Sequence, residues 1–269
     1  MTLKEEFIKL GYTEEDYEII RNNYAVNHIK DETLIKKLKD NFAFLLKMGY
    51  TKEEVIKMTK SLPQIYSYSI ENMKQKIEDM ITLGYTKEEV IKMTKNSPSI
   101  YSYSIETIKQ KIEDMITLGY TKEEVVKMTK GIPIIYSLSI ENMRQKIEDI
   151  ISLGYTKEEV IKMTKSLPSI YSLSIESIKQ KIDFYDSIDM HELAVINPKQ
   201  LMQSVNLSYA RYSFYKDRGI DIDMNNYRKL FVGQKKFEKT YGITKKELLE
   251  KYDYNKYKEE KEKENGRII

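Results

Sequence analysis

The sequence repeats itself four times with a period of 35 residues. Near-identical copies begin at Gly49, Gly84, Gly119 and Gly154 and end at residue 188. One copy of this length cannot bury an apolar helix face alone, whereas stacked copies bury such faces against one another. The chain is therefore predicted to fold as an array of units, each in contact mainly with its neighbours.

Each copy is predicted to contain three helices, and the first copy shows where the first two begin. Thr51 and Glu54 form a capping-box pattern, which starts a helix over residues 52–60. Pro63 cannot continue that helix, because it lacks an amide hydrogen and clashes with the preceding turn. Proline suits the first position of a new helix, so a short second helix is expected over residues 63–66.

The third helix carries the main apolar stripe of the copy. Ser69 is its predicted N-cap and residue 83 its end, and Gly84 is expected to close it in the left-handed conformation. The predicted stripe has helical periodicity and consists of Ile70, Met73, Ile77, Met80 and Ile81.

The array extends beyond the four clean copies. A degenerate unit begins at Gly11, with His28 in place of the proline, and another runs from Pro198 to Gly219. Asp189 stands where the pattern calls for glycine. All five prolines occupy the same place in their units, at positions 63, 98, 133, 168 and 198.

The fold prediction is an all-α solenoid, right- or left-handed, of three-helix repeats. Residues 1–48 form a degenerate capping repeat, 49–188 the four near-identical repeats, and 189–220 a degenerate C-terminal repeat. Residues 221–269 form a helical cap and a charged tail, which is expected to fray or remain disordered from Lys256 onward.

Charge is distributed unevenly along the chain. The net charge of +3 divides into −1 for residues 1–48, zero for 49–188 and +4 for 189–269. This is not a polybasic protein, so any binding of nucleic acid depends on how cations are arranged on one face. The sequence has no cysteine, no apparent targeting segment and no apolar run long enough to cross a bilayer, which predicts a cytoplasmic, non-membrane protein.

The repeated elements resemble those of the mitochondrial transcription termination factor (mTERF) family. The resemblance rests on the capped "TKEEV" helix, the following "P-x-I-Y" and the return to "LG", and Asn197–Gly219 resembles the closing unit of that family. It implies a curved array whose concave, positively charged face holds double-stranded nucleic acid. The chain departs from the family in the absence of a targeting segment and at a usually aliphatic place, which here holds Tyr66, Tyr101, Tyr136 and Tyr171.

Cations at two positions of the third helix are the candidate phosphate ligands, because stacking would align them from copy to copy. The first row is Lys74, Lys109, Arg144 and Lys179, and the second is Lys76, Lys111, Lys146 and Lys181. In the closing unit the candidates are Arg211, which aligns with Lys181, together with Lys216 and Arg218. The alternative is a solvated face on which Glu71, Glu78 and Asp79 balance the cations.

Two other repeated features have both a functional and a packing interpretation. The pair of residues before each proline varies between copies and could read bases, or it is a weakly constrained helix end. The repeated tyrosines could stack on bases, but their helical spacing beside Ile65 favours the core or the contact between repeats.

Catalysis is not predicted. His28 and His191 are far apart in the sequence and have no metal-ligand spacing, and there is no Gly-rich phosphate loop. No cofactor and no metal are expected. The leading hypothesis is a monomeric nucleic-acid-binding protein related to transcription, with double-stranded DNA favoured over RNA. The alternative is a scaffold that binds a protein partner in the same groove.

Overall fold

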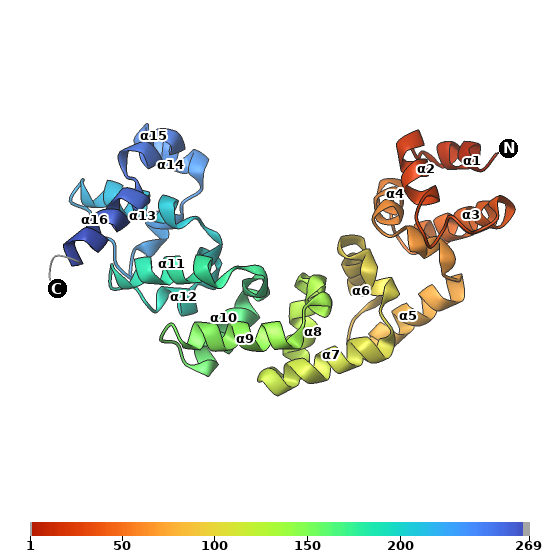
Figure 1. Ribbon diagram of the computed structural model, residues 1–269, viewed down its shortest axis with the longest axis horizontal. Coiled ribbons are helices and arrows are strands. Elements are labelled where there is room, and N and C mark those ends of the chain that lie inside the picture. The colour runs from red at the N-terminus through yellow and green to blue at the C-terminus, as the bar shows by residue number, and fades with distance from the viewer. Residues whose placement is uncertain (1, 266–269) are drawn as a thin grey trace. The chain divides into compact units, whose positions relative to one another are not determined.

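The computed structural model describes residues 2–265, apart from the side chains at positions 261, 262, 264 and 265. These residues form helices and turns, with no strand in the described part of the chain (Figure 1). The prediction of an all-α solenoid is confirmed. The chain divides into two compact units, Met1–Ile140 and Glu141–Ile269, a division that leaves the repeat-based domain boundaries untested.

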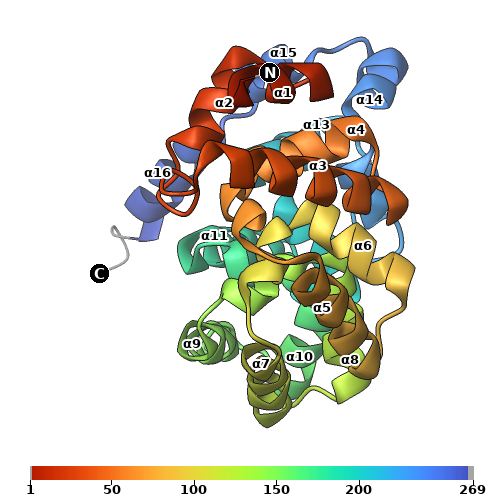
Figure 2. The same cartoon turned by 90° about the vertical axis from the view of Figure 1, so that its right-hand side faces the viewer.

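The first unit contains the N-terminal cap, two complete copies and part of the third. Helices α1, α2 and α3 of the cap contact one another and lie together in both views (Figures 1 and 2). The elements of this unit are α1 (Leu3–Leu10), α2 (Glu14–Arg21), α3 (Asp31–Lys47), α4 (Lys52–Ser61), η1 (Pro63–Ser67), α5 (Ile70–Thr82), α6 (Lys87–Asn96), η2 (Pro98–Ser102), α7 (Ile105–Leu118), α8 (Lys122–Gly131) and η3 (Pro133–Ser137).

The second unit holds the remaining repeats and the C-terminal cap. Helix α9 begins at the boundary between the units. The elements are α9 (Ile140–Ile151), α10 (Lys157–Ser166), η4 (Pro168–Ser172), α11 (Ile175–Asp186), α12 (Leu193–Ile196), η5 (Pro198–Met202), α13 (Val205–Lys216), η6 (Tyr227–Phe231), α14 (Gln234–Tyr241), α15 (Lys245–Lys251) and α16 (Tyr254–Asn265).

The predicted caps and breaks form in the first clean copy. The Thr51 side chain accepts from the amide of Glu54, whose carboxylate accepts from the amide of Thr51. Pro63 opens η1, which is a 3-10 helix. Ser69 caps α5, and Gly84 follows that helix with a φ of +108°. Local sequence signals therefore determine the boundaries of the three helices.

Asp189 keeps the left-handed turn that its glycine counterparts make. Its φ is +55°, and it is the one non-glycine residue with positive φ in the described part of the chain. Aspartate tolerates this conformation better than most residues because its short polar side chain can bond locally. The turn is thus conserved in geometry where the glycine is lost.

The apolar stripe of the third helix is narrower than predicted. Met73, Ile77 and Met80 of α5 are buried, and Ile70 is half-buried. Ile81 is 42% exposed, so its assignment to the buried stripe is wrong. The equivalent Ile116 of α7 is 43% exposed, which shows that the exposure belongs to the repeat position.

Buried tyrosine hydroxyls join successive repeats within the first unit. The hydroxyl of Tyr12 lies 2.8 Å from that of Thr59 and 2.7 Å from that of Tyr66. In the next copy Tyr50 bonds Thr94 and lies 3.2 Å from the hydroxyl of Tyr101. The same arrangement recurs once more, in the bonds of Tyr85 to Thr129 and Tyr136.

These junctions identify the role of the repeated tyrosines. Burial raises the pKa of Tyr50 and Tyr85, so both remain neutral hydroxyls. Tyr66 is fully buried, and Tyr101 and Tyr136 are nearly so. The prediction that these side chains belong to the core and to the contact between repeats is confirmed. The rings of these three tyrosines are therefore not free to stack on a base.

Ion pairs between first helices reinforce the same junctions. The ammonium of Lys95 lies 2.8 Å from a carboxylate oxygen of Glu54, and Lys130 lies 3.0 Å from Glu89. The Lys95 ammonium lowers the pKa of Glu54 through their hydrogen bond. Both carboxylates also serve the capping boxes of their own helices, so one side chain stabilises a helix end and a repeat junction.

The charged C-terminal stretch is helical in the described residues. Tyr209 of α13 stacks on Tyr257 of α16 with ring centroids 4.8 Å apart, and Tyr254 lies 5.4 Å from the same ring. These aromatic contacts pack the first turn of α16 against α13, and the helix continues to Asn265, so the expectation of a frayed or disordered tail is wrong as far as that residue. The remainder of that prediction concerns residues 266–269, which lie outside the described residues.

Candidate nucleic-acid interface

One predicted row of cations is exposed at the same position in all four copies. Lys74 lies on α5 and Lys109 on α7 in the first unit, while Arg144 lies on α9 and Lys179 on α11 in the second. None of the four makes a hydrogen bond or ion pair within the described residues. Each therefore presents a charge that an external anion can approach.

The second predicted row holds the repeats together. The Lys146 ammonium donates to the carbonyl oxygen of Leu173, which lies 2.6 Å away in the next copy. Equivalent bonds join Lys76 to the carbonyl of Tyr103 and Lys111 to that of Leu138. All three lysines are half-buried, and burial lowers the pKa of Lys76. Each ammonium group thus donates to a backbone carbonyl that the 3-10 helix of the next copy leaves without a partner.

Lys181 and Arg211, which continue that row, are buried. They are 7% and 1% exposed, and burial lowers the pKa of both. Lys181 donates to the hydroxyl of Ser177 at 2.9 Å. The Arg211 guanidinium donates to the carbonyl oxygen of Leu230 at 2.9 Å and to the side chain of Gln234 at 3.0 Å. Arg211 thus ties α13 to the segment that follows it.

Five of the eleven candidate residues are therefore removed from the set of accessible cations. They share one physical reason, since each ammonium or guanidinium group is taken up by hydrogen bonds inside the protein. The five are Lys76, Lys111, Lys146, Lys181 and Arg211.

Lys216 and Arg218 at the end of α13 remain exposed. The Lys216 ammonium lies 5.9 Å from the ring centroid of Tyr212. The Arg218 guanidinium lies 3.5 Å from the ring centroid of Phe214 and donates to the carbonyl of that residue. Both side chains rest on aromatic rings and keep their charges at the surface.

Carboxylates surround the exposed row in the clean copies. On α5, Glu71 precedes Lys74 by three residues and Glu78 follows it by four, and both are exposed. Such neighbours reduce the positive potential that a phosphate would meet. The clean copies on their own therefore offer isolated cations and no extended basic surface.

The strongest basic segment lies in the C-terminal cap. Residues 228–246 contain seven Lys and Arg side chains and one acidic residue, Glu238, which gives a local net charge of +6. All seven cations are exposed, and they are Arg228, Lys229, Lys235, Lys236, Lys239, Lys245 and Lys246. We name this set the C-terminal basic segment.

Aromatic contacts with α13 support part of this segment. Phe237 of α14 is fully buried, with its ring centroid 5.2 Å from that of Phe214 on α13. Helix α15 also packs on α13. Of the seven cations, only Lys246 has an ion pair in the described part of the chain, and its 3.9 Å contact with Glu250 is open to solvent. Contacts with α13 therefore position the backbone of α14 and α15, whose cations are exposed and mostly unpaired.

The sequence interpretation missed this segment although the signal was present. A charge total over residues 189–269 gives only +4, because acidic residues outside 228–246 cancel part of the excess. A shorter window separates the basic segment from those acids. The residues of the basic segment also lie after the last unit that contains a proline, so the repeat pattern does not align them with any other copy.

Both histidines have structural surroundings. The imidazole of His191 lies 2.6 Å from a carboxylate oxygen of Asp186 and stacks on the ring of Tyr155 at 4.2 Å. His28 contacts the carbonyl of Tyr24. Among the described residues no group of three or more His, Cys, Asp and Glu side chains could hold a metal ion. The helices of the described chain also include none long and apolar enough to cross a membrane.

The residue after each repeat proline varies between the copies, as the pair before it does, and its exposure also differs. Ile134 is 52% exposed, whereas Gln64, Ser99 and Ser169 are half-buried. This mixture gives no uniform row of side chains, and whether the variable positions read bases stays an open prediction.

Comparison with protein families decides the membership of this chain. The mTERF family model matches residues 8–117 and 80–238, which together cover most of the sequence. The chain belongs to the mTERF family. The mTERF match includes the first part of the C-terminal basic segment and ends within α14, so α15 and α16 lie beyond it. A comparison with curated proteins gives no match.

Proposed function

We propose that this mTERF-family protein binds double-stranded nucleic acid, with DNA as its ligand and a role related to transcription. The proposal is one of binding without catalysis. The C-terminal basic segment supplies the main phosphate contacts, and the exposed cations Lys74, Lys109, Arg144 and Lys179 supply weaker ones. Lys216 and Arg218 contribute beside the basic segment.

One observation carries the proposal. The seven cations of the basic segment are exposed and mostly unpaired, and the helices that carry them, η6, α14 and α15, pack on α13. Phosphate contacts release condensed counterions, so surfaces of this kind bind duplexes with an affinity that falls steeply with salt. Family membership supports the same interpretation, because the mTERF resemblance implies a repeat array that holds duplex nucleic acid.

The test is the salt dependence of duplex binding by the wild type and by a triple variant. Lys235→Gln, Lys236→Gln and Lys239→Gln together remove three charges of the basic segment while leaving the buried Phe237 in place. Fluorescence anisotropy with a labelled DNA duplex at several salt concentrations should show the slope of log K against log salt fall by about 2.7.

A charge-matched variant provides the control. Lys57, Lys92 and Lys127 are exposed at equivalent positions of α4, α6 and α8, and their replacement by glutamine removes the same net charge. This variant should keep the wild-type slope within about 1. Equal loss in the two triple variants would show that binding follows bulk charge and would overturn the assignment to the basic segment.

A second arm of the experiment separates DNA from RNA. An RNA duplex of the same sequence differs in groove shape and exposes 2′-hydroxyl groups. Tighter binding of the DNA duplex supports the proposal, and tighter binding of the RNA duplex contradicts its DNA part. No salt-sensitive binding of either duplex would reject the function.

A further inference from the structure

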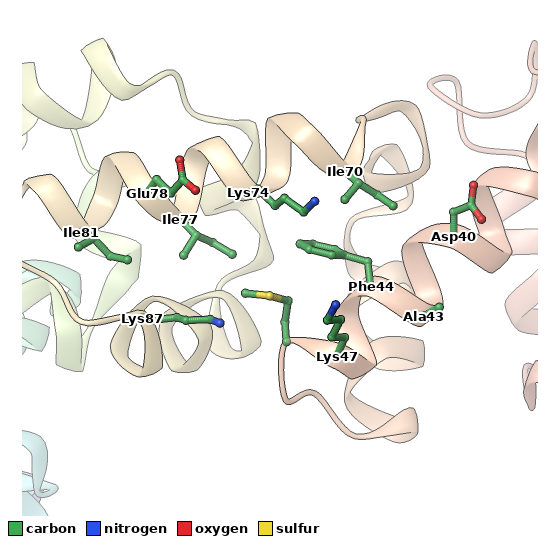
Figure 3. Close-up of a pocket in the computed structure, with 11 residues that line it drawn as sticks. Asp40, Ala43, Phe44, Lys47, Ile70, Lys74, Ile77, Glu78, Ile81 and Lys87 are labelled. Atoms are coloured by element: carbon green, nitrogen blue, oxygen red, sulfur yellow. The ribbon is translucent and has the colours of Figure 1, made fainter.

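An apolar groove lies between α3 and α5 in the first unit. It has a volume of about 640 Å³ and is lined by Phe44, Met48, Ile70, Ile77 and Ile81 among other residues (Figure 3). Three of these side chains come from α5 and are spaced by seven and four residues, so they follow one helix face for three turns. We name this site the N-terminal groove.

The groove is specific to the N-terminal cap. With Gly49 and Gly84 aligned, Ala43 and Phe44 of α3 correspond to Glu78 and Asp79 of α5. The equivalent wall beside α7 is therefore acidic, whereas the wall beside α5 is apolar. Apolar surface that is gathered at one place and open to solvent commonly marks an interaction site. Ala43 and Ile81 are exposed on opposite sides of this groove, which indicates a partner.

Cations surround the apolar floor. The ammonium groups of Lys47 and Lys74 lie on either side of the Phe44 ring, whereas the carboxylates of Asp40 and Glu78 point away from it (Figure 3). Lys87 lines the same groove from α6. No ion pair involves any of these five charged groups in the part of the chain that the structure describes. Three unpaired ammonium groups next to apolar surface favour a ligand that is both apolar and acidic.

We propose that the N-terminal groove docks an amphipathic helix of a partner protein, with an apolar stripe flanked by glutamate or aspartate. The two walls are helices, and a third helix laid between them covers the exposed Ile81 and the half-buried Met48 and Ile70. Its acidic flanks meet the three lysines, which gives charge complementarity. The twelve residues from Ile70 to Ile81 span roughly 16 Å, enough for anchors on three turns of the incoming helix.

The probe is a designed helical peptide that carries leucines at positions i, i+4, i+7 and i+11 and glutamates beside them. A second peptide has every glutamate replaced by lysine. Fluorescence anisotropy with the full-length protein should show at least tenfold tighter binding of the acidic peptide. Equal binding of the two peptides, or no binding of the acidic one, would overturn the proposal.

Two matched variants locate the site. Ile81→Glu places a charge in the groove, and Ile116→Glu makes the same change at an equally exposed position outside it, with exposures of 42% and 43%. The first variant should weaken binding of the acidic peptide at least tenfold, and the second should leave it unchanged. Because both isoleucines are exposed, neither change is expected to unfold the protein.

Self-association provides a further decisive result. Sedimentation of the free protein that shows a dimer abolished by Ile81→Glu would assign the groove to a second copy and overturn the partner-helix proposal. Monomeric behaviour of both variants supports it. Ile81→Glu adds one negative charge near Lys74, which makes only a weak phosphate contact, so the salt slope of duplex binding should stay within about 1 of the wild type. Failure of this proposal and failure of nucleic-acid binding are therefore distinguishable.

Discussion

The hydroxyl oxygens of Tyr50 and Tyr101 lie 3.2 Å apart and join two repeats across 51 residues of sequence. Thr94 completes the junction, because it also bonds Tyr50 and donates to the carbonyl of Val90. The junctions of Tyr12 and Tyr85 use the same three residue types. Each repeat therefore contributes to stability both by itself and through defined contacts with its neighbour, of which this junction is one.

Removing one hydroxyl from a junction should lower stability measurably. Tyr85→Phe deprives Thr129 and Tyr136 of a buried partner, and an unmade buried hydrogen bond costs about 1–2 kcal/mol. Tyr103→Phe is the control, because the Tyr103 hydroxyl makes no hydrogen bond within the described residues. Urea unfolding should separate the two variants, and equal midpoints would contradict a role for the junction hydroxyls.

Two lysines on α7 should show opposite phenotypes. Lys111 donates to the carbonyl of Leu138, so Lys111→Met should cost about 1–2 kcal/mol of unfolding free energy. Lys109 is unpaired, so Lys109→Met should change stability by less than about 0.5 kcal/mol. The salt dependence of duplex binding should show the opposite pattern. The slope of log K against log salt should decrease by about 0.9 for Lys109→Met and stay unchanged for Lys111→Met. A loss of stability in Lys109→Met would show that the two rows are wrongly distinguished.

Arg211 and Lys216 provide a similar contrast on α13. Arg211→Ala removes two hydrogen bonds to Leu230 and Gln234 from a buried site and should cost about 3 kcal/mol. Lys216→Ala removes an exposed cation and should leave the melting temperature nearly unchanged. Thermal unfolding followed by circular dichroism decides the matter, and a wild-type melting temperature for Arg211→Ala would count against the buried role.

Stability should fall in acid through the ion pairs between first helices. The pKa of Glu54 is lowered by its hydrogen bond to Lys95, and the pKa of Glu89 by the amide of Thr86 and then by Lys130. A lowered folded-state pKa gives stability that is present above the ordinary value of 4.5 and is lost as pH falls through the folded value. The variant with Glu54→Gln and Glu89→Gln should therefore lose less unfolding free energy below pH 4.5 than the wild type does.

Denaturant unfolding at a series of pH values measures this difference. Above pH 5 the double variant should be the less stable protein, because its amides cannot replace the charged bonds. Parallel pH profiles for the two proteins would mean that other carboxylates govern the acid response.

Deleting residues 84–118 should leave a folded protein with one copy fewer. The deletion brings equivalent residues together, so Tyr50 can meet Thr129 and Tyr136 in place of Thr94 and Tyr101. Circular dichroism should give the same helical signal per residue, with a lower melting temperature because one set of contacts is lost. An aggregated or unfolded deletion protein would contradict the nearest-neighbour account.

The helices could be predicted from sequence because their ends are determined locally. Thr51, Pro63 and Gly84 act on the backbone within a few residues, so their effects do not depend on the rest of the chain. The fate of the cations could not be predicted in this way. The side chains of Lys74 and Lys76 leave the helix in directions about 200° apart. Only the position of the Tyr103 carbonyl in the next copy determines which of the two lysines forms a hydrogen bond.

The candidate interface shows the same limit. A charge count treats the free Lys109 and the bonded Lys111 as equal, although only one of them can meet a ligand. The exposure of Ile81 could not be predicted from the periodic pattern either. Periodicity shows which face of the helix is apolar, but it does not show how much of that face the neighbouring repeat covers. The C-terminal basic segment, in contrast, could be predicted from the sequence by summing charge over a shorter stretch of residues.

The uniform tyrosine junction has a consequence for the history of the gene. Every clean copy offers a Thr and a Tyr at one boundary and a Tyr at the other, so any copy can follow any other. Unequal recombination between the coding repeats would then add or remove whole copies without creating a junction that has to evolve anew. The protein can thus change its length by whole repeats in single genetic steps.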